Sequence, residues 1–151
     1  MNRIAKIATV LAIVGLIIWF VLLPNYFDGS PRASVTAAIM YAAKIRSALD
    51  SACSEGTFES KQKLADLGMP SSDPKAYIYR AEFSHLTQST ARLKAYLGDI
   101  YAHPFFGLFP WKVVSQGRFI EFEFTCTADR EFSYRFDSDL EPKYLPASLR
   151  K

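Results

Sequence analysis

The first block in the hydrophobic pattern is an uncharged, almost wholly apolar run over residues 7–23. Arg3 and Lys6 precede this run and Pro24 follows it. At about 1.5 Å of rise per helical residue, the run is roughly long enough to cross a hydrocarbon layer about 30 Å thick. Because backbone groups in lipid must be satisfied within the segment, a span of this kind is helical. The pattern therefore predicts a transmembrane helix whose ends are marked by Lys6 and Pro24.

A secretory signal peptide is the competing interpretation, since Arg3 and Lys6 also fit the charged start of such a peptide. The apolar run is longer than the usual hydrophobic region of a signal peptide, and no cleavage site of small residues follows Leu23. These features favour an uncleaved anchor. Cationic residues before the anchor predict a cytoplasmic N-terminus, with the rest of the chain across the membrane.

Beyond the anchor, apolar residues recur at steps of three and four over residues 34–53. This spacing places them on one face of a helix and predicts an amphipathic segment. Ser30 and Pro31 have the residue types of an N-cap and a first turn, so the helix could restart there. The rest of the chain is expected to cover the apolar face. The residues of that face are Val35, Ala38, Ile39, Ala42, Ile45, Leu49 and Cys53.

The C-terminal third alternates between apolar and polar residues. One alternating stretch covers residues 118–127 and a second covers 130–136, with a turn predicted between them. A period of two predicts strands, and the short connection predicts a hairpin with one apolar face. The residues assigned to that face are Ile120, Phe122, Phe124, Cys126, Phe132, Tyr134 and Phe136.

The middle of the chain gives weaker signals. Gly and Pro residues over 54–74 predict a connecting loop, with room for a short helical piece at 59–67. Residues 87–101 are ambiguous, with a helical tendency at 90–97, and 137–151 reads as an irregular tail. Residues 76–84 alternate and predict a strand, with Tyr77, Tyr79, Ala81 and Phe83 on one side.

Composition changes the picture little. The 151 residues carry a net charge of +3, of which Arg3 and Lys6 supply two, so the part beyond the predicted anchor is close to neutral. This balance gives no electrostatic reason to expect nucleic acid as a partner. Five cations of the remaining chain admit two interpretations. They could form a basic patch that binds DNA, but an ordinary solvated surface is the more common arrangement. The cations that could form that patch are Arg80, Arg92, Lys94, Lys112 and Arg118.

The sequence lacks the familiar catalytic signatures. It has no nucleophile motif, no Gly-rich phosphate loop and no H-E-x-x-H zinc motif. His85 and His103 lack ligand-like spacing with each other and with the cysteines, so we interpret them as surface or capping residues. We therefore expect a protein that is not an enzyme and that uses no cofactor, metal or small-molecule substrate.

An aromatic segment at residues 104–111 admits two interpretations. It contains Phe105, Phe106, Phe109 and Trp111, and it is broken by Gly107 and a proline, so we predict a loop. The loop could fold onto the sheet and complete the core. Alternatively, the four aromatic residues could form an exposed patch that docks on a partner.

Several short segments resemble type IV pilins. Residues 23–26 (LPNY) and 32–38 (RASVTAA) are similar to the L-P-x-Y…R-x-x-V-T-E-A stretch of that family. Residues 67–70 (LGMP) and 75–78 (KAYI) resemble its loop and first strand, 124–127 (FTCT) its W-x-C strand, and 143–150 (KYLPASLR) its closing K-Y-L-P-x-x-C-R. The resemblance implies an α+β, pilin-like fold: a long N-terminal helix, transmembrane and then amphipathic, packed on a small antiparallel sheet. Its parts would be an anchor (1–24), an amphipathic continuation (25–53) and a periplasmic β head (54–151).

The start of the chain departs from the family. Pilin precursors carry a leader that ends in Gly, followed by F-T-L-x-E, whereas here no Gly precedes Gly15 and the first acidic residue is Asp28. The place of that glutamate falls at Lys6 or Ile7. A carboxylate buried there can pair with a neighbouring ammonium, but Lys6 would bring like charges together. We therefore expect a chain that is not processed and does not enter the filament shaft.

The resemblance and its departures together imply a function. The expected function is non-enzymatic assistance to type IV pilus biogenesis or dynamics, by contact with pilin subunits or inner-membrane machinery. The expected location is the bacterial inner membrane, with the C-terminal domain in the periplasm. One alternative is a minor pilin or pseudopilin that is incorporated in a filament. Another is a periplasmic DNA- or ligand-binding module.

The cysteines also depart from the family pattern. The family's final Cys is Leu149 here, so the usual disulfide of the C-terminal loop cannot form. In a pilin-like fold the sheet packs on the helix that carries Cys53, so the resemblance implies a disulfide between Cys53 and Cys126 in an oxidising compartment. Two separately buried free thiols are the alternative.

Overall fold

The structure is a computed structural model of the chain, and it describes residues 3–17, 23–102 and 111–150. Two helices come first, α1 (Arg3–Ile17) and α2 (Leu23–Glu55). Six strands follow: β1 (Ile78–Thr87), β2 (Thr90–Leu97), β3 (Ile100–Ala102), β4 (Trp111–Val114), β5 (Phe119–Cys126) and β6 (Phe132–Ser138). Short 3₁₀ turns occupy Phe58–Ser60, Leu64–Leu67, Pro74–Ala76, Pro142–Tyr144 and Ala147–Leu149.

The predicted long N-terminal helix with a transmembrane first half is wrong. The described helical segments are α1 over Arg3–Ile17 and α2 over Leu23–Glu55. Among the described residues, neither helix has the length and apolar character to cross a membrane. The pilin-like fold class expected around that helix is corrected with it.

The helix does not restart at Ser30–Pro31, the place that the sequence allowed for it. α2 continues through Pro31, which lies inside the helix. A proline in a helix interior removes one backbone hydrogen bond and usually bends or breaks the helix. Pro31 is fully buried in the domain, so packing of its ring offsets part of that cost.

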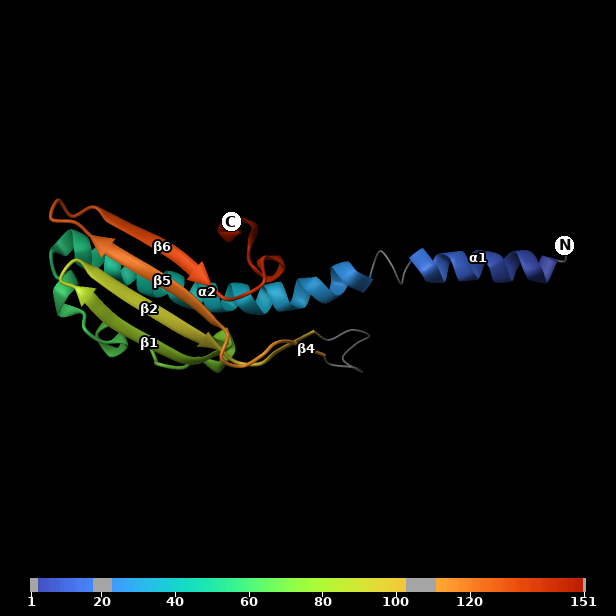
Figure 1. Cartoon of the computed structure of the whole chain (residues 1–151), viewed down its shortest axis with the longest axis horizontal. Coiled ribbons are helices and arrows are strands. Elements are labelled where there is room, and N and C mark those ends of the chain that lie inside the picture. Colours follow the sequence, from blue (N-terminus) through green and yellow to red (C-terminus); the bar gives the residue numbers. More distant parts are fainter. Residues whose placement is uncertain (1–2, 18–22, 103–110, 151) are drawn as a thin grey trace.

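The main sheet has four antiparallel strands in the order β1-β2-β5-β6 (Figure 1). β3 and β4 lie between β2 and β5 in the sequence and form a separate antiparallel ribbon. The ribbon extends from the end of the main sheet (Figure 1). Neighbouring strands of the main sheet are therefore either adjacent in sequence or joined through the ribbon.

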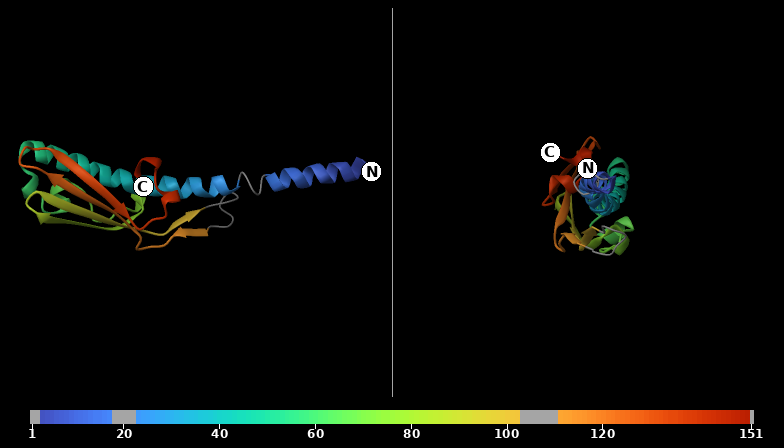
Figure 2. Two further views of the ribbon diagram at one scale, coloured as in Figure 1. Left: turned by 45° about the horizontal axis from the view of Figure 1, so that its top comes forward. Right: turned by 90° about the vertical axis from the view of Figure 1, so that its right-hand side faces the viewer.

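The core lies between α2 and the inner face of the sheet (Figure 2). The predicted apolar face of α2 is confirmed, with Ile39 at its half-buried margin and all its other residues buried. The opposing side chains include Ala91 and Ala95 of β2, whose small size lets the helix lie close to the sheet. Larger residues complete this core on both sides, namely Leu93, Leu97, Ile120, Phe122 and Phe124.

β2 corrects the helical tendency predicted for residues 90–97. Ala, Leu, Arg and Lys are strong helix formers, and their propensity suggested a helix. The same residues also alternate, so that Ala91, Leu93, Ala95 and Leu97 are buried while the intervening side chains are half-buried. Pairing with β1 and β5 on both sides decides in favour of the strand. Tertiary packing thus overrides local propensity.

The other strand predictions fare differently. The hairpin of β5 and β6 is confirmed, and Ile120, Phe122 and Phe124 are buried as predicted. In β1 the predicted face is only partly correct, because the buried residues are Ile78 and Ala81. A register shift between Ile78 and Arg80 turns Tyr79 outward. Such a bulge inserts an extra residue and reverses the alternation on one side of it.

The C-terminal tail is more ordered than predicted. β6 continues to Ser138, and the chain then turns back toward α2, where Leu140, Tyr144 and Leu145 are buried. Arg32 of α2 donates from Nε to the carbonyl oxygen of Lys143 over 2.6 Å. The tail therefore packs against α2 near Arg32, at the end of the domain opposite the disulfide.

Candidate functional site

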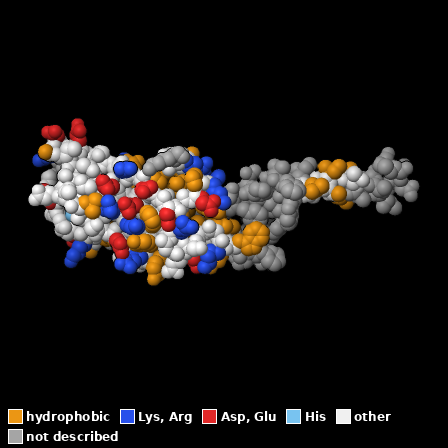
Figure 3. Space-filling view, in the orientation of Figure 1, with side chains coloured by type: hydrophobic (Ala, Val, Ile, Leu, Met, Phe, Trp, Pro, Cys, Tyr) orange, Lys and Arg blue, Asp and Glu red, His pale blue; other side chains and the backbone are white. Residues whose placement is uncertain are grey.

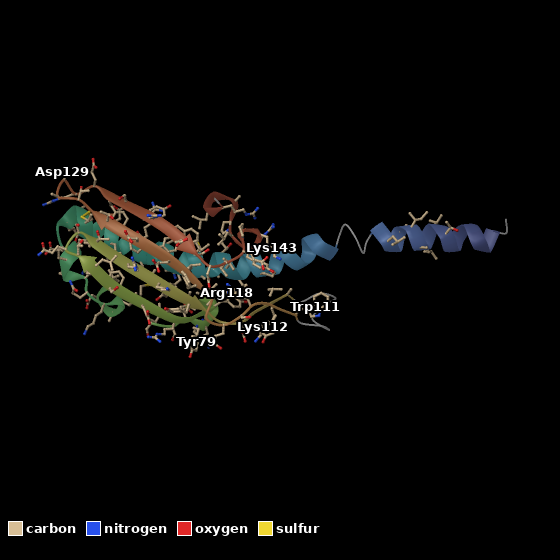
Figure 4. The ribbon with its side chains drawn as sticks, viewed as in Figure 1. Tyr79, Trp111, Lys112, Arg118, Asp129 and Lys143 are labelled. Carbon is tan, nitrogen blue, oxygen red and sulfur yellow. A yellow bond between two sulfur atoms is a disulfide. The ribbon has the colours of Figure 1, made fainter. Side chains whose placement is uncertain are left out.

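The predicted disulfide between Cys53 and Cys126 is present, with a Cα–Cα distance of 5.7 Å. It joins the last turn of α2 to the last residue of β5 across a separation of 73 residues. The bond is visible in yellow at the end of the domain farthest from the N-terminus (Figure 4). In the chain-entropy description, a loop of this length stabilises the fold by about 4 kcal/mol.

The same end of the domain holds a helix cap that the sequence did not reveal. Arg130 lies in the turn between β5 and β6, and its Nη1 donates to the carbonyl oxygen of Ser54 over 2.9 Å. A cation at a helix C-terminus satisfies a free carbonyl and matches the helix dipole. Arg130 has φ of 61°, an unusual value for a residue other than glycine, and the turn therefore holds its side chain at some backbone cost.

The outer face of the sheet, away from α2, carries a network of ion pairs. Arg92 Nε lies 3.3 Å from Glu121 and Arg92 Nη2 lies 3.3 Å from Glu123. Lys94 Nζ lies 3.7 Å from Glu121 and 3.9 Å from the ring centre of Phe119. Figure 3 shows acidic and basic side chains interspersed on this side of the molecule. A shallow hollow of about 230 Å³ lies among them.

The five cations considered as a basic patch each have an acidic partner. Arg92 and Lys94 belong to the network of ion pairs just described, and Arg80 pairs with Glu82. Lys112 Nζ lies 2.7 Å from Asp99, and Arg118 Nη1 lies 3.5 Å from Asp139. The charges on this surface therefore alternate in sign, which is the arrangement of a solvated, ion-paired face.

The β3–β4 ribbon presents aromatic and charged side chains at its surface. Trp111 begins β4 and is 57% exposed, and Tyr101 of β3 is partly exposed. The hydrogen bond from Lys112, with one from the Gln116 backbone N–H, lowers the pKa of the Asp99 carboxyl. The ion pair with Lys112 thus fastens Asp99, which lies between β2 and β3, to strand β4. Figure 4 shows Trp111 and Lys112 next to each other on this ribbon.

Trp111 is the member of the predicted docking patch that falls within the described residues. Phe105, Phe106, Phe109 and His103 lie outside the described residues. Lys6 lies within α1 and Pro24 within the first turn of α2, a position that tolerates proline. Of the residues named for the disulfide, the anchor ends and the docking patch, those in the described ranges that come together are Cys53 and Cys126.

His85 has a structural environment. Its Nε2 lies 2.9 Å from the carbonyl oxygen of Lys61, and its ring contacts those of Phe58 and Phe83 edge-on. In the part of the chain that the structure describes, no group of three or more His, Cys, Asp or Glu residues is arranged to hold a metal. His85 therefore fastens the segment after α2 to β1.

Among the described residues, α2 and the antiparallel sheet form a disulfide-bonded domain whose surface carries shallow hollows and exposed side chains. No protein-family model, curated protein or solved structure matches the chain. Its function therefore has to be inferred from its own residues and surfaces.

Proposed function

We propose that the chain is a non-enzymatic accessory protein of type IV pilus biogenesis or dynamics, which acts by contact with pilins or their assembly machinery. The contact between Arg32 and Lys143 carries this proposal. The two residues begin the segments 32–38 and 143–150, both of which resemble pilin sequence. They are 111 positions apart, yet Arg32 Nε donates to the Lys143 carbonyl oxygen. The contact brings two of the segments that carry the resemblance together in the folded chain.

The disulfide supports the proposed compartment. Cys53 and Cys126 are joined, and such bonds persist in oxidising compartments such as the bacterial periplasm. A domain that works outside the cytoplasm would meet pilin heads on that side of the membrane. We accordingly propose that the β head acts in the periplasm.

Two apolar surfaces could make the contacts. The described side chains of α1, residues 9–16, are all exposed, and they include Val10, Leu11 and Ile13. The second surface is the ribbon, through Trp111. Exposed apolar patches of this kind often mark protein–protein contacts.

A deletion strain tests the proposed function. Loss of the gene should lower or alter the amount of major pilin in the sheared-pilus fraction and change twitching motility, and the wild-type gene should restore both. A blot of sheared pili beside washed membranes, with the intact mass measured, separates the candidates. Full-length protein absent from the sheared pili supports an accessory protein, whereas a shortened form in the pili would make it a minor pilin. Unchanged pili and motility in the deletion strain would contradict the proposal.

The contact surface can be tested separately with a photo-crosslinking amino acid. Placed at Trp111 in cells, it should yield an adduct detected with antibody against the major pilin. Tyr79 is a matched control, since it is also an aromatic residue of the β head and is 59% exposed. Equal pilin adducts from both positions, or none from Trp111, would show that the ribbon is not the contact surface.

A further inference from the structure

The edge of the sheet formed by β6 has unpaired backbone groups that point away from the sheet. Hydrogen bonds from Thr127 N to Glu131 O and from Asp139 N to Phe119 O mark hydrogen-bonded pairs at both ends of the β5–β6 ladder. Antiparallel pairs alternate, so the odd-numbered residues of β6 face β5 and the even-numbered ones face outward. The N–H and C=O groups of Phe136 therefore point away from the sheet. No other strand lies beside β6 in the described sheet.

Two exposed charges of opposite sign flank Phe136. Arg135 and Asp137 lie on the outer face of β6, across from Glu123 and Glu121 of β5. Neither has an ion-pair partner among the described residues. Asp137 uses Oδ1 to accept the backbone N–H of Ser138 over 3.0 Å, and its other oxygen is available. The carboxylates of Asp137 and Glu121 also face one another, an arrangement that disfavours both.

We propose that β6 is a self-association edge that pairs antiparallel with β6 of a second copy of this chain, about a two-fold axis at Phe136. This register places Phe136 opposite Phe136 of the partner subunit, with both outward backbone groups paired. It also places Arg135 opposite Asp137 of the partner subunit, and the same pair occurs again by symmetry. These flanking positions are non-hydrogen-bonded pairs, in which side chains approach most closely. Each unpaired charge thus gains a partner of opposite sign.

The inner face of the edge fits the same register. Tyr134 is 41% exposed, and the ring receives Arg46 of α2 at 4.1 Å from its centre. In the proposed dimer, Tyr134 of the partner subunit lies opposite Ser138. Beside Ser138, the strand and the C-terminal tail line a hollow of about 130 Å³ with mostly apolar residues. The apolar residues of that hollow are Phe136, Leu140, Pro142, Leu145 and Leu149.

The charges of Arg135 and Asp137 favour a second copy of this chain as the partner of the β6 edge. An unrelated strand would meet a cation and an anion two residues apart, and such charges on an edge normally prevent pairing. A symmetric antiparallel copy meets them in reverse order and neutralises both. The inference is independent of the proposed function, because an accessory protein could act as a monomer or as a dimer.

The first test is the molar mass of the full-length protein in solution. Sedimentation equilibrium from about 10 µM to 1 mM, a range in which small interfaces associate, should show reversible dimers of the wild type. The dimer should weaken as salt is raised, because exposed ion pairs are screened. A wild-type protein that stays monomeric over this range would overturn the proposal.

Charge exchange then tests the register. Asp137→Arg should weaken the dimer by at least about tenfold, because it places two pairs of like charges across the axis. The fold should survive, since the new cation faces Glu121 within the chain. The double variant Arg135→Glu, Asp137→Arg should restore the dimer, because both pairs are reversed together. An intact dimer in the single variant, or no restoration in the double variant, would overturn this register.

A matched control comes from the opposite edge of the sheet. Glu82→Arg makes the same change of charge on the exposed outer side of β1. It should leave the dissociation constant unchanged within about twofold, because the proposed interface does not include β1. An equal weakening by Glu82→Arg would point to net charge rather than to the β6 edge, and would contradict the proposal.

Discussion

At the start of β1, from Ile78 to Ala81, the outer edge of the sheet is covered by the segment that precedes the strand, whereas along β6 the outward backbone groups face no strand of the described chain. On the β1 side, Ala81 N donates to Ser71 O over 2.6 Å, and Asp73 exchanges backbone hydrogen bonds with Ile78. Farther along, His85 contacts the carbonyl oxygen of Lys61. On the β6 side, the corresponding protection consists of two charged side chains, Arg135 and Asp137.

The difference shows two solutions to one physical problem. An exposed edge strand presents unpaired N–H and C=O groups that can pair with another chain. Covering β1 requires an ordered segment between α2 and the sheet, which also contributes Phe58 and Leu64 to the core. The charges on β6 protect its edge without an additional segment of chain. They prevent pairing only by strands whose own charges do not complement Arg135 and Asp137. The β6 edge is therefore selective, and the β1 edge is closed over its first residues, Ile78–Ala81.

Removal of the disulfide should have the largest effect, and it should affect both edges together. We expect the double variant Cys53→Ala, Cys126→Ala to lose on the order of 4 kcal/mol in the free energy of unfolding, because the unfolded chain is no longer cross-linked. The bond ends on β5, between the two edges, and fastens the sheet to α2. Urea denaturation of the full-length protein measures the loss.

Reduction of the wild-type protein with a thiol reagent serves as the control for the substitutions themselves. It should lower the unfolding free energy by a similar amount, while the reagent should leave the double variant unchanged. A loss below about 1 kcal/mol in both experiments would contradict the role given to this bond.

The sequence predicted the apolar faces well where periodicity was strict. The face of α2 and the alternation of Ile120, Phe122 and Phe124 could both be read directly, and the cysteines on those faces are joined. Periodicity failed where two signals overlapped. In residues 90–97, helix-forming side chains also alternate, and only pairing on both sides decides for a strand.

The edges could not be predicted in this way, because they depend on long-range contacts. A bulge near Tyr79 reversed the expected face of β1, and nothing local in the sequence marks it. Tyr41 contacts Pro70, and Arg130 caps α2, through single hydrogen bonds between distant segments. Arg135 and Asp137 resemble any alternating surface charges until the strand order places them on an edge. The apolar run 7–23 was predicted to cross a membrane from its composition, whereas among the described residues neither helix is long and apolar enough to do so.

Tyr41 provides a smaller, pH-dependent test of the closed edge. Its hydroxyl donates to the carbonyl oxygen of Pro70, next to Ser71, and burial with the nearby Asp73 charge raises its pKa to about 12. The unfolded phenol has a lower pKa of about 10, so folding favours the protonated form. The stabilisation is present below pH 10 and falls as pH rises from 10 toward 12, by on the order of 2 kcal/mol.

The variant Tyr41→Phe separates the contribution of the Tyr41 hydroxyl to stability from the titration of the lysines and of the other tyrosines. Below pH 10 the wild type should be more stable by about 1 kcal/mol, because the variant leaves the Pro70 carbonyl without its donor. Above pH 10 this advantage should shrink and then reverse. Urea denaturation at pH 8, 10 and 11.5 measures the difference, and a constant difference at all three values would contradict the assignment.

Amide hydrogen exchange should show the smallest effect and should separate the two edges most directly. The Ala81 N–H donates to Ser71 O on the β1 edge, so it should exchange slowly at every protein concentration. The Phe136 N–H points outward from β6, so it should exchange quickly in dilute protein. If β6 pairs with a second copy, concentration should slow the Phe136 amide severalfold and leave Ala81 unchanged. In Asp137→Arg the Phe136 amide should stay fast at every concentration. A Phe136 amide that is slow in dilute monomer would mean that its own chain already covers β6, and the contrast between the two edges would then disappear.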